Sequence, residues 1–270
     1  MFAVDVWMAS AWHWMVALGT GAALGFFGGV FGIGGGVIAI PLLVLAYGMD
    51  QPLAQGTALV MMVPNLLIAW WRYHRITPAP WPRVLGIGAL GTLTTWFMAR
   101  WATALPPDTL RLMFCAFLAW VGWSMWRAQR PVTQAPGEPS SRLNPRYIPL
   151  VGVLGGSSMG LMGIGGGLLA TPLLTGWFGL RQAMAQSLAL ALVAPSAVMA
   201  LGTYAQAHRV DWQMGLPMAL AGTLTVSSGV ALATRLPERT LRRNFALMLM
   251  GTSGWMAVWP WLQRALEIGR

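Results

Sequence analysis

GIGGG at residues 32–36 occurs a second time as GIGGG at residues 163–167, so that the two copies are 131 residues apart. The same offset aligns further residues: Pro41 with Pro172, Gln55 with Gln186, Pro64 with Pro195, Trp81 with Trp212 and Arg111 with Arg242. One register, kept from the first glycine run onward, indicates an internal duplication. We therefore expect two related halves, residues 1–128 and 147–270, joined by a Pro-, Ser- and Gly-rich linker at residues 129–146.

The composition favours a lipid bilayer as the solvent of this chain. Of its 270 residues, 56% are hydrophobic and only 9% are charged, and the mean hydropathy is +0.60. Such a chain has too little polar surface to cover a water-soluble globule. Its apolar stretches repeatedly approach the roughly 20 residues that a membrane-spanning helix needs. We predict an all-α, polytopic membrane protein in contact with the lipid bilayer, without a separate soluble domain.

The cations behind the net charge of +10 are all arginine, and they do not indicate nucleic acid. A nucleic-acid-binding protein gathers its cations on one solvated face, whereas these arginines lie mostly at segment ends and in loops, as the positive-inside rule expects. No nucleophile with its base, pair of carboxylates or metal-binding spacing stands out, and Cys115 is the only cysteine. The sequence therefore predicts no enzyme, no metal and no cofactor.

Each half is predicted to contain five helical segments in the same order. The ranges are 12–31, 37–48, 53–72, 83–102 and 108–127 in the first half, and 147–162, 168–179, 183–204, 213–234 and 240–262 in the second. The second segment of each half spans only on the order of 18 Å and cannot cross a hydrocarbon core of about 30 Å. We therefore expect each GIGGG run to be the turn of a broken or re-entrant helix pair, followed by three spanning helices.

The distribution of arginine distinguishes two topologies. If each GIGGG run turns the chain back, each half crosses an odd number of times, the halves are inverted, and 12 of the 17 arginines share one face. If the first two segments form one continuous crossing, the halves are parallel and the arginines divide 10 to 7. The positive-inside rule favours the inverted arrangement, which places both termini outside the cell and residues 129–146 in the cytoplasm.

The glycine runs have two interpretations, and nucleotide binding is not one of them because neither a βαβ context nor a GK-Ser/Thr sequence is present. The first is close helix packing, since glycines recur every four residues at Gly28, Gly32 and Gly36 and at Gly152, Gly156 and Gly160. The second is a binding site, because a half-helix that begins after the run presents unpaired N–H groups and a positive dipole end to an anion. The residues assigned to this site are Gly34, Gly35, Gly36, Gly165, Gly166 and Gly167.

Polar residues of the third segments are further candidates for contact with the solute. They are Gln55, Thr57 and Asn65 in the first half and Gln186, Ser187 and Ser196 in the second. Interhelical hydrogen bonding is the alternative role for all of them. The acidic residues fall at segment ends, in loops or at the termini. Because carboxylates inside a membrane mark cation and proton pathways, the solute is predicted to be an anion or a neutral molecule.

A His-Arg pair follows the third segment of each half, His74-Arg75 and His208-Arg209. Solvated loop charge is one interpretation of these pairs. A gate, or an attraction for anions at the two mouths, is the other.

The pattern G-x-x-G-[IV]-G-G-G-x-x-x-x-P-[LV]-L, present twice and each time followed by a kinked polar helix and a His-Arg loop, resembles the sulfite exporter TauE/SafE family. Val210-Asp211-Trp212 is similar to that family's loop, whereas the first copy lacks the aspartate. The resemblance implies a transporter of the bacterial inner membrane that moves small sulfur-containing anions such as sulfite or organosulfonates. An anion channel and a non-transporting assembly or sensing protein are the alternatives. The substrate, the direction, proton coupling and a homo-oligomer stay open.

Overall fold

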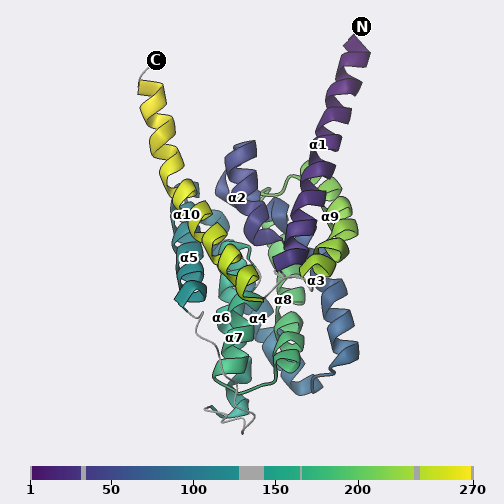
Figure 1. Cartoon of the computed structure of the whole chain (residues 1–270), viewed down its shortest axis with the longest axis vertical. Helices are drawn as coiled ribbons and strands as arrows, with labels where there is room; N and C mark the ends of the chain where they lie inside the picture. Colours follow the sequence, from purple (N-terminus) through teal and green to yellow (C-terminus); the bar gives the residue numbers. More distant parts are fainter. Residues whose placement is uncertain (1, 32–34, 128–142, 165, 234–237, 269–270) are drawn as a thin grey trace.

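The computed structural model describes residues 2–31, 35–127, 143–164, 166–233 and 238–268, and the regular elements in these ranges are all helices (Figure 1). In chain order they are α1 (Phe2–Phe31), α2 (Gly36–Tyr47), α3 (Gln51–Ile76), α4 (Trp81–Ala104), α5 (Pro107–Arg127), the 3-10 helix η1 (Pro145–Tyr147), α6 (Ile148–Met162), α7 (Gly167–Gly176), α8 (Gln182–Gln206), α9 (Trp212–Ala233) and α10 (Glu238–Ile268). The predicted all-α class is confirmed.

Four of the described helices are long and apolar enough to cross a membrane, namely α3, α5, α8 and most of α9. The sequence predicts six spanning helices, three in each half. The other two, α4 and α10, have 24 and 31 residues. They have the length but are less apolar, because α4 contains arginine, glycine and threonine, and α10 begins with the charged sequence ERTLRR. Large apolar side chains such as Leu224 and Ile76 are 82% and 79% exposed, as contact with lipid requires.

Both glycine runs lead directly into short helices. After them come α2 with 12 residues and α7 with 10, which agrees with the expected short second segments. At 1.5 Å per residue, such helices extend about 15 to 18 Å and end inside the thickness of a bilayer. The expected ends are less accurate elsewhere, because α1 begins at Phe2 instead of residue 12 and α10 continues to Ile268 instead of residue 262.

Two helix crossings are so close that only glycine fits. The first is α1 on α9, where a Cβ added to Gly25 would lie 2.3 Å from the carbonyl oxygen of Gly222. The second is α6 on α4, where a Cβ added to Gly156 would lie 2.3 Å from the carbonyl oxygen of Gly91. Gly25 and Gly156 are 131 residues apart, and so are Gly91 and Gly222. The first helix of each half thus packs on the fourth helix of the other half.

The glycines that form these crossings correct one expectation. In α6 the packing series is Gly152, Gly156 and Gly160, as the sequence predicts. In α1 it is Gly21, Gly25 and Gly29, and the predicted series through Gly28 and Gly36 was wrong. Gly36 instead lies against the side chain of Met62 in α3. A glycine-rich helix contains several series with a spacing of four, and only the position of α9 selects the one that packs.

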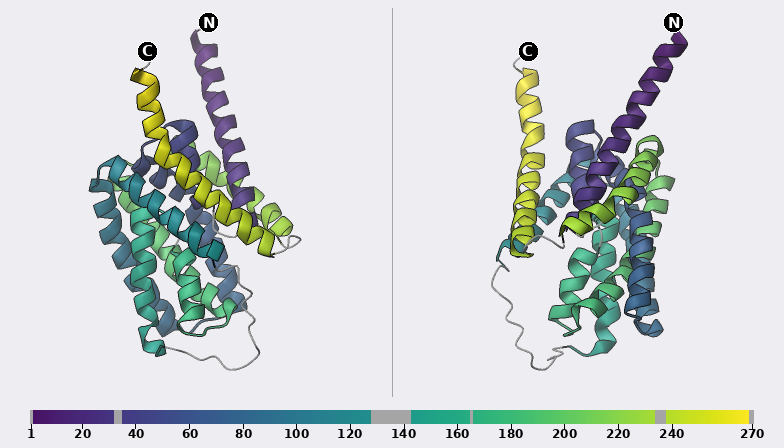
Figure 2. Two further views of the ribbon diagram at one scale, coloured as in Figure 1. Left: turned by 60° about the vertical axis from the view of Figure 1, so that its left-hand side comes forward. Right: turned by 45° about the vertical axis from the view of Figure 1, so that its right-hand side comes forward.

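The two short helices lie toward opposite ends of the molecule. Figure 1 shows α1 and α2 in the upper part and α6 and α7 in the lower part, while both chain termini lie at the upper end in every view (Figures 1 and 2). Between them, α3 and α8 pack against each other and contribute many of the fully buried side chains. The candidate site lies where α3 and α8 meet the glycine turns.

Candidate functional site

The second glycine turn lies directly against α3. Gly163, which ends α6, has a φ of +64°, in the left-handed region that L-residues with a Cβ avoid. Its N–H donates to the carbonyl oxygen of Met159 (3.0 Å). A Cβ added to Gly163 would lie 3.1 Å from the Cβ of Gln55. Glycine is therefore required here both by the backbone conformation and by the contact with Gln55.

Gln55 is connected to α8 by a buried hydrogen bond. The Tyr204 hydroxyl donates to Gln55 Oε1 (2.6 Å), and it also lies 3.2 Å from the carbonyl oxygen of Gly160 in α6. Both side chains are completely buried. The amide nitrogen Nε2 of Gln55 has no hydrogen-bond partner in the described part of the chain. An unpaired donor in such a place is costly, so it is available to an acceptor that enters the site.

Tyr204 is absent from the residues that the sequence identifies as candidates. The signal was nevertheless there, because the offset of 131 aligns Tyr204 with Tyr73. The two tyrosines differ in environment: Tyr204 is fully buried and Tyr73 is 38% exposed. This difference means that the two halves are not in identical conformations.

We expect Tyr204→Phe to lower the free energy of unfolding by about 1 kcal/mol, the usual size of a hydrogen bond between membrane helices. Phenylalanine keeps the ring packing and removes only the donor to Gln55. Thermal denaturation of the purified protein in detergent measures this change. Tyr73→Phe is the matched control, and equal losses of stability in the two variants would contradict a special role for the Tyr204 hydroxyl.

The predicted glycine positions are described only in part, because Gly34 and Gly165 lie outside the described residues. Gly35 precedes α2 with a φ of +79°, and Gly166 precedes α7 with a right-handed helical conformation. Gly36 and Gly167 are the first residues of α2 and α7. The first N–H groups of a helix lack partners within the helix. In the first half these groups lie beside the Met62 side chain, since a Cβ on Gly36 would meet its sulfur.

Thr57 and Ser187 connect each central helix to a loop of the other half. The Thr57 hydroxyl accepts a hydrogen bond from the backbone N–H of Asp211 (3.0 Å). The Ser187 hydroxyl donates to the carbonyl oxygen of Thr77 (2.9 Å). Both side chains are buried. Their proposed contact with a solute would require them to share or exchange these partners.

The remaining polar candidates lie along the same two helices. Asn65 donates to the carbonyl oxygen of Met61 (3.3 Å), while its Oδ1 is buried without a partner. The Ser196 hydroxyl is also buried and unpartnered, and Gln186 is half-buried. Gln51, one turn before Gln55, was not predicted, and neither its amide oxygen nor its nitrogen has a partner in the described residues. The printed contacts join none of these four to Gln55.

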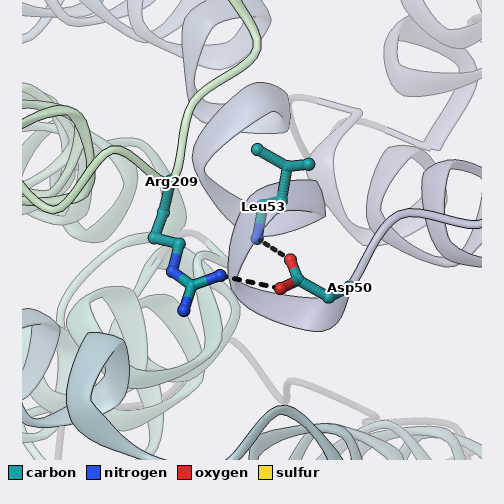
Figure 3. Close-up of polar contacts among 3 residues, drawn as sticks. All are labelled: Asp50, Leu53 and Arg209. Atoms are coloured by element: carbon teal, nitrogen blue, oxygen red, sulfur yellow. Dashed lines mark hydrogen bonds and ion pairs between the residues drawn. The ribbon is translucent and has the colours of Figure 1, made fainter.

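The two predicted mouths differ in their interactions. Arg209 forms an ion pair with Asp50 (Nη1 to Oδ2, 2.8 Å), and Asp50 Oδ1 accepts from the N–H of Leu53 at the start of α3 (Figure 3). His208 adopts a φ of +55° beside it. Because the pair is more than a third exposed, it contributes only about 0.2–1 kcal/mol. Its main effect is to hold the loop between α8 and α9 against α3.

At the other mouth the aromatic residues dominate. The His74 ring lies between Trp70 and Trp81, and the Arg75 guanidinium lies 4.0 Å from the centre of the Trp71 ring. The offset aligns Asp50 with Arg181 and Arg209 with Pro78. The ion pair of the first mouth therefore cannot be reproduced here.

Comparison with known proteins gives the family. A family model described as "Sulfite exporter TauE/SafE" matches residues 17–256. The chain belongs to this family. The family expected from the two glycine motifs is therefore confirmed, and nearly the whole of both halves lies inside the match.

Relatives of this TauE/SafE protein bear the name "Probable membrane transporter protein". One from Xylella fastidiosa is 27% identical over 248 residues, covering 88% of this chain and 93% of its own length. Others from Methanocaldococcus jannaschii and Haemophilus influenzae are each 24% identical, covering 88% and 87% of this chain and 91% and 95% of their own lengths. No solved structure matches. The chain is thus a multi-pass membrane protein of a transporter family.

Proposed function

We propose that this protein exports a small sulfur-containing anion, such as sulfite or an organosulfonate, across the bacterial inner membrane. The solute would bind between the two glycine turns and the central helices α3 and α8, and would reach the two faces alternately. The family description supports the sulfur chemistry, and the names of the relatives support transport.

The observation that carries the proposal is the uncharged, buried donor of Gln55 at the tip of the α6–α7 turn. Gln55 Nε2 is unpartnered, and Gly163 brings the backbone turn against the same side chain. Asp50 precedes α3 and Asp211 precedes α9, so both carboxylates lie at helix starts. A site with neutral donors and without an adjacent carboxylate favours an anion over a cation.

Several features support an inverted repeat that alternates between two states. The crossings of α1 on α9 and of α6 on α4 use residues related by one offset. The short helices α2 and α7 lie toward opposite ends of the molecule, and both termini lie at one end (Figure 1). Inverted repeats commonly place the substrate between discontinuous helices. We propose that the termini are periplasmic and that residues 129–146 are cytoplasmic.

The two tyrosines support a state that is closed at one side. Tyr204 bridges Gln55 and α6, while its counterpart Tyr73 is partly exposed. In a symmetric exchange of states the contacts of the two tyrosines would alternate. The halves would then exchange roles while the site between them stays the same.

Uptake by proteoliposomes tests the proposal. Sulfite, sulfoacetate and other small sulfonates are expected to enter vesicles that contain the protein, with saturation, while sodium and potassium are not. The same vesicles with an imposed pH gradient show whether protons are coupled. Correctly folded protein that moves none of these anions would contradict transport and favour the assembly or sensing role.

A further inference from the structure

An apolar groove of about 620 Å³ lies between α4 and α8, away from the candidate site. Its walls include Trp81, Leu85, Leu93 and Trp96 of α4 and Pro195 and Met199 of α8. A smaller recess of about 210 Å³ shares Trp96, Pro195 and Met199 with it and continues to Gln206. Because they share walls, the two recesses form one furrow along α8, and we call it the α4–α8 furrow.

The α4–α8 furrow has the length and surface of a site for an apolar chain. From Ala191 to Gln206 it follows α8 for roughly 22 Å, more than the depth of about 15 Å that one leaflet contributes to the hydrocarbon core. Its wall residues Leu85 and Leu93 are 63% and 54% exposed. In a membrane protein, exposed apolar side chains at this depth contact lipid tails.

One end of the furrow carries polar atoms that lack partners. The His74 ring lies 6.4 Å from the Trp70 ring and 5.1 Å from the Trp81 ring, and both tryptophans line the furrow. The nitrogens His74 Nδ1 and Trp70 Nε1 are buried without a hydrogen-bond partner in the described residues. An indole nitrogen can only donate. This end therefore requires an acceptor, such as a phosphate or ester oxygen.

The same end carries positive charge that no acidic side chain neutralises. Arg72 and Arg75 lie near the end of α3, and Arg83 lies in the first turn of α4. The ion pairs recorded among the described residues involve Arg111 and Arg209. None of the three is in an ion pair there. An anion at this position would gain three nearby cations beside the apolar furrow.

We propose that the α4–α8 furrow binds an anionic phospholipid, with its phosphate at His74, Arg75 and Arg83 and one acyl chain along α4 and α8. A second copy of this chain fits less well, because two copies in the same membrane orientation would bring the same arginines together across a two-fold axis. The lipid satisfies the unpaired donors, the cations and the apolar walls at once. The site is independent of the proposed transport.

Native mass spectrometry of the purified full-length protein tests this site, with dioleoyl phosphatidylglycerol and dioleoyl phosphatidylcholine as probes. We expect the anionic lipid to bind about 10-fold more tightly or more, since each arginine near a membrane surface contributes roughly fivefold. The double variant Arg75→Gln/Arg83→Gln should lose this preference and keep the affinity for phosphatidylcholine. Ala89→Trp, which narrows the furrow, should weaken the binding of both lipids.

Arg127→Gln is the matched control, because Arg127 also lies over a tryptophan ring, that of Trp123, but outside the furrow. It should leave both affinities unchanged. Equal binding of the two lipids, or an equal loss in the control variant, would overturn the proposal. So would displacement of the lipid by inorganic phosphate or sulfite at millimolar concentration, which would indicate a site for free anions. A dimer that forms through this face and excludes lipid would overturn it too.

Discussion

Replacing Gln55 by glutamate should lower the rate of anion uptake into proteoliposomes by about 100-fold or more. The side chain is fully buried against Gly163, and its Nε2 is the unpaired donor of the site. A carboxylate there would remove that donor and place a negative charge beside the anion. Opposing like charges cost several kcal/mol, and each 1.4 kcal/mol corresponds to a factor of ten. The initial rate of uptake at saturating anion concentration measures the effect.

Gln182→Glu provides the matched control for this substitution. Gln182 is an exposed residue in the first turn of α8, where a negative charge is favourable for the helix. We expect its effect on uptake to stay within about twofold, as for most surface substitutions. If both glutamate variants lose transport to the same extent, Gln55 has no particular role in binding.

The second large effect concerns stability. Gly156→Ala should destabilise the protein by as much as about 3 kcal/mol, the upper range for overpacking, because the new Cβ would lie 2.3 Å from the carbonyl oxygen of Gly91. The helices α4 and α6 would have to separate. Gly25→Ala should have a similar effect on α1 and α9, since the same distance separates its Cβ from Gly222. Thermal denaturation in detergent compares the variants.

Gly251→Ala in α10 is the control for the helix-crossing variants, because a Cβ at Gly251 meets nothing within 4 Å. Alanine is a better helix former than glycine by about 1 kcal/mol. This variant should therefore be as stable as the parent or more stable. Destabilisation by Gly251→Ala equal to that of Gly156→Ala would mean that the close crossings do not determine stability.

The sequence carries much of the fold because apolar length and glycine runs are local signals. The short helices that begin at Gly36 and Gly167 follow directly from GIGGG and the apolar residues after it. The choice of helix partners is different in kind. That α1 packs on α9 depends on residues some two hundred positions away, and no periodicity within α1 distinguishes the series through Gly25 from the series through Gly28.

The candidate site was predictable in part for the same reason. Gln55 could be selected because a polar residue in an apolar segment is conspicuous and recurs at the offset. Tyr204 was missed because a tyrosine in a membrane helix is ordinarily packing or interface material, and only its contact with Gln55 gives it a role. Arg209 was expected at a mouth, but its pairing with Asp50 needed the structure, since the two lie in different halves of the chain.

Counterflow tests the central claim, alternating access to one anion site, most directly. Proteoliposomes loaded with unlabelled sulfite are diluted into a trace of ³⁵S-labelled sulfite, and the label inside is followed with time. A carrier exchanges one anion for another, so we predict that the label rises transiently above its equilibrium level. A rise to equilibrium only, at a rate proportional to concentration without saturation, would indicate a channel and contradict the account.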